Sequence, residues 1–421
     1  MSVYLERYAF KSLKLAENQP NNLGLVVVVP VYNEPDITPA LESLYNCELP
    51  AIHVEVILVI NEAEDSEAKV IQQNNVTYLQ AAEWLASHQK PGISFYCSRL
   101  KLPKRHAGVG LARKAGMDEA TRRFESIGNK KGIILCYDAD CKCSPNYLTE
   151  VYNAFDTREL QGASIYYEHP INSLNESELS GIVQYELHLR YYVNALRRAG
   201  YPYAFHTVGS SMAVRSDMYQ KAGGMNRRKA GEDFHFLHKV IPYGNFGEVN
   251  TTTVYPSPRV SDRVPFGTGK AMGTWLKEEK SELLSYHPEI FRLLNELLVS
   301  VPYHFKNSNY TKFETRLSSA VIRFLKDANY ENELIRINKQ STTPEMFLNK
   351  WFHWFDGLKA LHFVHYLRDN YYTSIPVTKA ASLLVNLNED NPLKLLKHYR
   401  MLDKEFKEGK INLKHLFSEY Q

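Results

Sequence analysis

Short apolar runs alternate with stretches of helical periodicity in the N-terminal part of the chain. The first run, residues 25–31, is rich in β-branched residues and predicts a strand buried on both faces of a sheet. Later apolar runs predict further strands, and the periodic stretches predict the helices between them: strands over 54–60, 93–97 and 132–137, and helices from Thr38, within 65–85 and over 110–124. This alternation predicts an α/β fold with a Rossmann-like, mostly parallel sheet and flanking helices.

The pattern changes near residue 279. From there to Gln421 the apolar residues follow helical spacing, aromatic residues are frequent, and strand alternation is absent. A chain of 421 residues also exceeds the usual size of one hydrophobic core. We therefore expect an N-terminal extension (1–21), an α/β catalytic domain (22–278) and a mainly helical accessory domain (279–421). The aromatic residues Trp351, Phe352, Trp354 and Phe355 are expected in the accessory core, with a sugar-binding platform as the alternative.

Composition narrows the class of protein. The chain is 44% hydrophobic and 23% charged, as in ordinary globular proteins, and its formal net charge of +3 gives little support to a nucleic-acid partner. The first 20 residues lack the apolar core of a signal peptide, and the run 25–31 is too short for a transmembrane segment. We expect a cytoplasmic enzyme. A peripheral membrane contact through the basic stretch 394–400 is the alternative to a solvated helix face.

The cysteines favour a reducing compartment. There are five, an odd number, which argues against the disulfide framework of a small secreted domain. Cys141 and Cys143 form a C-x-C, but no second cysteine pair follows, so a zinc site is not expected.

Polar residues follow three of the predicted strands. Pro30, Tyr32 and Glu34 lie at the end of the first strand, Asn61 at the end of the second, and Asp138-Ala139-Asp140 at the end of the fourth. In open α/β sheets ligands bind beyond the carboxyl ends of the strands. These segments are therefore the first candidates for a site.

Asp138 and Asp140 carry the clearest chemical meaning. In an extended segment residues i and i+2 point to the same side, so both carboxylates would face one point. Mg²⁺ and Mn²⁺ prefer oxygen ligands, and Mg²⁺ is often held by one or two carboxylates together with substrate phosphates. The alternative is an Asx turn that caps a helix near Pro145.

A second acidic pair, Glu232-Asp233, precedes a periodic stretch and so stands at a predicted helix start. Acidic residues there complement the helix dipole, which is the structural alternative to a catalytic role. A positioned carboxylate can also take a proton from an attacking hydroxyl group, and Asp233 suits that role. His206, His235 or His238 would be a further metal ligand, or else an ordinary core or surface histidine.

These motifs, in this order and spacing, resemble family 2 glycosyltransferases of the GT-A fold. The resemblance covers roughly residues 22–275 and rests on six segments: 29–34, 108–116, Asp138-Ala139-Asp140, 208–215, 222–225 and Glu232-Asp233. The sequence departs from the family after the second strand, where Asn61-Glu62 stands in place of paired aspartates. That departure leaves the nucleobase open.

The resemblance implies an enzyme that transfers a sugar, with inversion, from a UDP- or GDP-sugar to a hydroxyl acceptor, which is a saccharide, a lipid-linked molecule or a small molecule. Mn²⁺ or Mg²⁺ would be held by Asp138 and Asp140. Asp233 would be the base and Glu232 an orienting partner. The remaining implied contacts are Pro30, Tyr32, Glu34, Asn61, Arg113 and Asp138 for the donor, and Gly209, Ser210 and Ser211 for the acceptor.

A segment rich in Pro, Gly and cations, residues 256–270, follows the acidic pair. Its composition is typical of a functional loop, and Arg259, Arg263 and Lys270 would neutralise a diphosphate there. A solvated basic loop is the alternative.

Other functions fit less well. A retaining GT-A transferase acting on a small acid such as glycerate shares the D-x-D and the helical C-terminal region. A catalytically inactive nucleotide-sugar-binding scaffold would lack one of the acidic positions, and all are present. The Gln-x-x-Arg-Trp motif of membrane-embedded processive synthases is absent, as is the Gly-rich, Arg-ending loop of nucleotidyltransferases.

Overall fold

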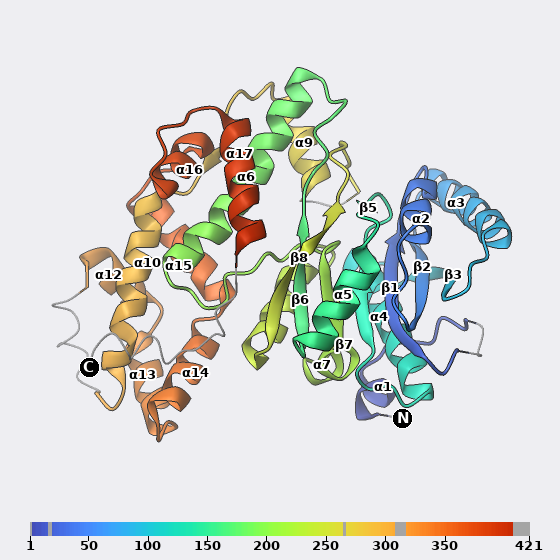
Figure 1. Ribbon diagram of the computed structural model, residues 1–421. Coiled ribbons are helices and arrows are strands. Elements are labelled where there is room, and N and C mark those ends of the chain that lie inside the picture. Colours follow the sequence, from blue (N-terminus) through green and yellow to red (C-terminus); the bar gives the residue numbers. More distant parts are fainter. Residues whose placement is uncertain (1, 16–18, 264–266, 308–316, 407–421) are drawn as a thin grey trace. The chain divides into compact units, whose positions relative to one another are not determined.

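The computed structural model of the protein describes residues 2–15, 19–263, 267–307 and 317–406 (Figure 1). The chain divides into two compact units. The first is built from residues 1–182, 207–279 and 403–405, and the second from 183–206, 280–402 and 406–421. The long helix α6 (Glu176–Arg198) contributes residues to both units.

An eight-stranded sheet forms the centre of the first unit, in the order β3-β2-β1-β4-β7-β6-β8-β5. Its strands are β1 (Leu23–Val31), β2 (His53–Ala63), β3 (Ile93–Leu102), β4 (Ile133–Cys136), β5 (Lys142–Cys143), β6 (Gly162–Tyr167), β7 (Met212–Arg215) and β8 (Phe246–Tyr255). Strand β1 is buried along its whole length and pairs in parallel with β2 and β4, as its continuous apolar run predicted.

The sheet is mixed rather than mostly parallel. Strands β1 to β4 pair in parallel, but β7 runs antiparallel between β4 and β6, and β5 is antiparallel to β8. The strands that introduce the antiparallel pairs are short, so they leave little periodicity in the sequence. The predicted α/β fold of GT-A type, with a mainly helical C-terminal region, is confirmed.

The helices of the first unit, besides residues of α6, are α1 (Val3–Arg7), α2 (Thr38–Tyr45), α3 (Ala68–Ser87), α4 (Val109–Ser126), α5 (Tyr147–Thr157), α7 (Ser216–Lys221), α8 (Glu232–Val240) and α9 (Thr268–Lys277), with a 3-10 turn at Ile241–Tyr243. Helix α4 packs on β1 and β2, and α3 packs on β2 and β3. Gly116 of α4 faces Val28 of β1 so closely that a Cβ atom would overlap the valine side chain. This close approach fixes the distance between α4, which carries Arg113, and the sheet.

The N-terminal segment is anchored to the same helix. The Tyr4 hydroxyl donates to Asp118 Oδ1 at 2.7 Å and accepts from Lys114 Nζ at 2.7 Å. The backbone N–H of Phe10 donates to the other Asp118 oxygen at 2.6 Å. Asp118 is fully buried, so these donors compensate a carboxylate that water cannot reach.

The second unit is mainly helical. Besides residues of α6 it contains α10 (Pro288–Ser300), α12 (Ser319–Asp327), α13 (Tyr330–Lys339), α14 (Pro344–Trp354), α15 (Gly357–Asn370), α16 (Val377–Val385) and all but the last three residues of α17 (Pro392–Glu405), a 3-10 turn at Val301–His304, and a two-stranded ladder of β9 (Leu284–Ser285) and β10 (Ile375–Pro376).

Aromatic side chains form much of the core of this unit. Trp351, Phe352 and Phe355 are fully buried, and the rings of Trp351 and Phe355 stack with centroids 4.9 Å apart. The indole N–H of Trp351 donates to the Tyr330 hydroxyl at 3.0 Å, so its polar atom is satisfied. The core prediction for these residues is confirmed, and the alternative of a sugar-binding platform is wrong for them.

Candidate active site

The polar segments singled out from the sequence meet at one edge of the sheet. Strands β1, β2 and β4 run in parallel and in register, with Val28 opposite both Ile57 and Cys136. Their carboxyl ends therefore lie at the same edge, as expected for a ligand site in an open α/β sheet. The segment after β1 and the D-x-D after β4 are the two neighbouring loops of this edge.

The D-x-D lies in a turn and not in extended backbone. Strand β4 ends at Cys136, and the Asp138 carbonyl accepts a hydrogen bond from the Cys141 N–H at 3.1 Å. The prediction that strand alternation aligns the two carboxylates is therefore wrong, because the chain turns directly after the strand. The helix-capping alternative is also wrong: α5 begins after Asn146 without a side-chain cap, and both aspartates pair with arginines instead.

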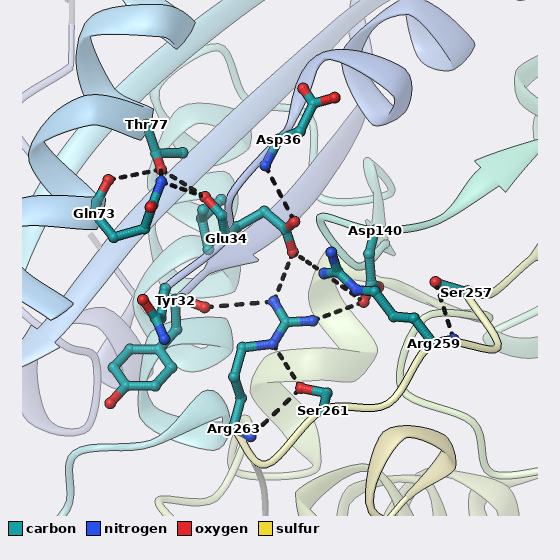
Figure 2. Close-up of polar contacts among 12 residues, drawn as sticks. Tyr32, Glu34, Asp36, Gln73, Thr77, Asp140, Ser257, Arg259, Ser261 and Arg263 are labelled. Atoms are coloured by element: carbon teal, nitrogen blue, oxygen red, sulfur yellow. Dashed lines mark hydrogen bonds and ion pairs between the residues drawn. The ribbon is translucent and has the colours of Figure 1, made fainter. Parts of the chain in front are cut away.

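Two arginines from the loop after β8 bridge Glu34 and Asp140 (Figure 2). Arg263 donates to Glu34 Oε2 at 2.6 Å and to Asp140 Oδ2 at 2.8 Å. Arg259 donates to the same two oxygens, at 3.1 Å for Asp140. Glu34 is completely buried, so these guanidinium groups compensate a carboxylate that has lost its hydration. The carboxylate predicted to contact the nucleoside is thus occupied by arginines.

Helix α3 fixes the loop that carries Glu34. Thr77 Oγ1 donates to the Glu34 carbonyl at 2.7 Å, and Asn74 Oδ1 accepts from the Asn33 N–H at 3.0 Å. Asn33 is in the left-handed region at φ 48°, which asparagine tolerates better than most residues. Sequence reasoning missed Asn74 and Thr77. Their spacing of three on the buried face of a helix was the available signal.

The other donor-side residues after β1 and β2 have mainly backbone roles. Asn61 is buried and its Nδ2 donates to the Val31 carbonyl at 2.8 Å, which ties β2 to β1. Pro30 is buried within β1. The Tyr32 carbonyl accepts from Arg263 at 3.4 Å, while its half-buried ring points away from the two arginines (Figure 2).

Arg113 joins the D-x-D to the second acidic pair. Its guanidinium group donates to Asp138 Oδ1 at 2.6 Å and to Glu232 Oε1, and the side chain is 2% exposed. Glu232 and Asp233 open α8, as predicted, after Gly231 in the left-handed conformation at φ 67°. Gly110 allows this contact, because a Cβ there would lie 2.9 Å from the Glu232 Cβ. Sequence reasoning gave Arg113 a donor contact and did not predict this bridge.

Burial changes the acid strength of these carboxyl groups. It raises the pKa of Glu232 to about 7, against the lowering effect of Arg113, and it also raises the pKa of Asp233. Desolvation likewise raises the pKa of Asp138 although Arg113 opposes it. Asp233 is half-buried, and its Oδ1 accepts the Phe234 N–H at 2.8 Å. A carboxylate with a raised pKa is a better proton acceptor near neutral pH than an ordinary one.

Gly209 is the predicted acceptor-side residue that approaches the charged groups most closely. A Cβ at Gly209 would lie 2.7 Å from Arg113 Nη1 and 3.0 Å from Asp233 Oδ2, so a larger residue there would require these charged groups to shift. Ser210 and Ser211 are 2% and 1% exposed, and the buried Ser211 hydroxyl has no hydrogen-bond partner among the described residues. The predicted acceptor segment therefore offers little side chain to solvent beside the acidic pair.

Lys270 differs from the two arginines of its segment. It is exposed on α9 and pairs with Asp262 at 3.4 Å, and in the described part of the chain no contact joins it to Glu34 or Asp140. Residues 264–266 of this segment lie outside the described residues.

The carboxylates fit a divalent cation only as a two-ligand site. In the described ranges, no cluster of three or more His, Cys, Asp and Glu side chains is arranged to hold a metal. His238, one of the histidines considered as a ligand, is half-buried beside Phe234 with ring centroids 4.4 Å apart, and desolvation lowers its pKa to about 4. Mg²⁺ is commonly bound by one or two carboxylates, with phosphate oxygens and water in its other coordination positions, so a pair of carboxylates is compatible with this ion.

Comparison with known proteins gives the family of the N-terminal part of the chain. Residues 26–223 match the family Glycosyl transferase family 2. Residues 26–223 therefore form a family 2 glycosyltransferase domain, and the resemblance drawn from the sequence is confirmed. The protein is a glycosyltransferase. The match includes Glu34, Arg113 and the D-x-D, and it ends before Glu232.

Solved structures with some likeness include the S. aureus TarS. Residues 1–349 of TarS in complex with UDP-GlcNAc are 13% identical, with a TM-score of 0.38, over 94% of this chain and 92% of that chain. The complex with UDP is 14% identical, with a TM-score of 0.36 and the same coverage. A longer TarS structure is 15% identical, with a TM-score of 0.36, over 85% of this chain and 55% of that chain. No curated protein matches the chain.

Among the described helices, none combines the length and the apolar character needed to cross a membrane.

The close approach at Gly209 yields a first prediction. Gly209→Ala pushes Arg113 or Asp233 out of place, and misplacement by about 1 Å at a reacting centre can cost on the order of a hundredfold in rate. We expect the turnover number for glycosyl transfer to fall by about ten- to a hundredfold. Gly273→Ala on α9 is the matched control, because the Cβ there would meet only a Val260 methyl group at 3.2 Å. Equal turnover of the two variants would contradict the described geometry.

Proposed function

We propose that this glycosyltransferase takes a nucleoside diphosphate sugar, UDP- or GDP-linked, and transfers the sugar to a hydroxyl acceptor with inversion at the anomeric carbon. The observation that carries the proposal is the Arg113 bridge. It brings the D-x-D carboxylate Asp138 and the acidic pair Glu232-Asp233 into one charged cluster. A donor bound beside Asp138 and an acceptor bound beside Glu232-Asp233 would meet at this cluster.

Asp138 and Asp140 are the residues that would hold Mn²⁺ or Mg²⁺. Within the cluster Glu34, Asp138, Asp140, Glu232 and Asp233 stand against Arg113, Arg259 and Arg263, which leaves a formal excess of two negative charges. A divalent cation matches that excess. When bound, it would supply Lewis-acid stabilisation of the charge that develops on the diphosphate leaving group.

Asp233 is the proposed base. Glu232 is 3% exposed and its Oε1 is engaged by Arg113, so its carboxylate is held as a structural partner of the arginine. Asp233 is half-buried, and its raised pKa favours proton transfer from a hydroxyl group. It accepts the proton while the acceptor oxygen attacks the anomeric carbon. The nucleoside diphosphate leaves from the opposite face, which inverts the configuration.

Arg113 is proposed as a positioning residue. Its contacts fix Asp138 on one side and Glu232 on the other, and Glu232 begins the helix that carries Asp233. A buried guanidinium between two carboxylates is held by charge-assisted hydrogen bonds in a fixed plane. The Arg113 guanidinium group therefore holds both Asp138, on the donor side, and the start of the helix that carries the proposed base.

The proposal predicts a selective effect at Asp233. Asp233→Asn removes the proton acceptor while keeping the shape of the side chain, and general base catalysis contributes typically about 10²- to 10⁴-fold. We expect the turnover number to fall by that factor while the dissociation constant of the sugar nucleotide changes by less than about threefold. Kinetics and calorimetry measure the two quantities, and NMR of the native product is expected to show the inverted anomer.

Asp262→Asn is the control for this substitution, because Asp262 is exposed and pairs only with Lys270 in the described contacts. A turnover number of Asp233→Asn equal to that of the control would remove Asp233 from the role of base. A product that retains the donor's configuration would instead favour the retaining mechanism.

The pKa shifts predict an acid limb in the pH profile. The base must be ionised, so activity is present above its pKa and is lost as pH falls through it. Because burial raises the pKa of Asp233, the loss begins above the range of exposed carboxyl groups, which lies near about 4. Glu232→Gln removes one of the two carboxylates that pair with Arg113, so more of the positive charge of Arg113 acts on Asp233 and we expect the limb of kcat/KM to move to lower pH. A native profile that is flat down to about pH 4.5 would contradict a base with a raised pKa.

A further inference from the structure

The two arginines of the loop after β8 occupy a proposed cation ligand. Arg259 and Arg263 both donate to Asp140 Oδ2, at 3.1 and 2.8 Å. The same guanidinium groups donate to Glu34 Oε2, so each arginine spans the gap between the two carboxylates (Figure 2). Asp140 Oδ2 thus already accepts two charge-assisted hydrogen bonds.

A cation held by Asp140 would compete with these guanidinium groups for the same carboxylate. Both are positive, so a cation bound at Asp140 would repel arginines that stay in contact with that carboxylate. A cation that binds alone must displace these charge-assisted hydrogen bonds, which are stronger than those between neutral groups. The contacts of Asp140 therefore oppose cation binding until an anion other than Glu34 engages the two arginines.

A diphosphate is the partner that releases them. Phosphate oxygens accept the paired N–H groups of arginine with bidentate geometry, as carboxylates do. Glu34 is buried and its loop is fixed by Thr77, so it keeps the arginines at the site when they turn away from Asp140. Ser261 Oγ accepts from Arg263 Nε at 2.8 Å, which further limits how far that guanidinium group can move.

We propose that Arg259 and Arg263 couple cation binding to nucleotide binding: they hold Asp140 until a nucleoside diphosphate engages their guanidinium groups, and Glu34 keeps them in place for that exchange. This inference rests on the proposed function. It makes the cation and the nucleotide bind cooperatively, and because such coupling is reciprocal, each ligand tightens the other by the same factor. It also limits occupation of the site by a cation without donor.

The test measures Mn²⁺ affinity by isothermal titration calorimetry and by electron paramagnetic resonance of free Mn²⁺. Each protein is titrated alone and with saturating UDP or GDP, after correction for Mn²⁺ held by the nucleotide in solution. The proteins are the native chain, Arg259→Gln/Arg263→Gln, and Lys277→Gln. The last removes one positive charge from exposed Lys277 of α9, which makes no described contact with Glu34 or Asp140.

We expect the native protein to bind Mn²⁺ weakly alone and at least about tenfold more tightly with the nucleotide, a coupling in the usual range. The double variant is expected to bind Mn²⁺ alone about tenfold more tightly than the native protein and to lose most of the enhancement by nucleotide, because Asp140 has lost two donors. Lys277→Gln should behave as the native protein does.

Two further variants keep the inference falsifiable if the double variant folds poorly. Arg263→Gln leaves Arg259 on both carboxylates and should show part of the effect. Arg263→Lys keeps the positive charge but loses the planar guanidinium group that contacts two carboxylates. Tighter Mn²⁺ binding by this variant would show that the lost contact with Asp140, and not a lost charge, causes the change in affinity.

Unchanged affinity for Mn²⁺ alone in the arginine variants, with nucleotide binding intact, would overturn the inference and leave the proposed donor site standing. A native protein that binds neither Mn²⁺ nor the nucleotides would overturn the proposed donor site, and the coupling with it.

Discussion

The structure depends on one electrostatic constraint: carboxylates gathered at the carboxyl edge of a buried sheet must be paired. Glu34 and Glu232 are almost completely removed from water, and an ionised carboxylate in that position is costly unless charged donors compensate it. Arg113 compensates one end of the cluster, and Arg259 with Arg263 compensates the other. The arginines come from two segments far apart in the sequence, helix α4 and the loop after β8, so the charge balance exists only in the folded first unit.

The fold supplies the geometry that this charge balance requires. The parallel pairing of β1 with β2 and β4 brings the segment of Glu34 beside the D-x-D, and the close packing of α4 on β1 sets the position of Arg113. Glycine at position 209 leaves just enough room for Arg113 and Asp233 to approach the same point. The catalytic proposal follows from this convergence, because the carboxylates differ in environment: some are held by arginines, while Asp233 keeps a raised pKa and partial access to water.

Much of this architecture was predictable from local patterns. The apolar run at 25–31 and the helix from Thr38 are found where periodicity placed them, and the acidic pair opens a helix as expected. The sequence could not reveal partners 119 or 229 residues apart, such as Arg113 with Glu232 or Arg263 with Glu34, because long-range ion pairs leave no periodic signal. It also predicted an extended D-x-D, since the turn that begins after Cys136 has no glycine or proline to mark it. Short strands such as β7 were missed for a similar reason: four residues are too few to define a period.

The central claim is that this carboxylate and arginine cluster is a cation-dependent site for a sugar nucleotide. The most direct measurement is a thermal-shift screen of UDP- and GDP-sugars, with Mn²⁺ and with EDTA, on the native protein and on Asp140→Ala. Specific binding raises the melting temperature by mass action. The account predicts a shift for one donor class that requires Mn²⁺ and disappears in the variant. A shift that is the same with EDTA, or that persists in Asp140→Ala, would contradict it.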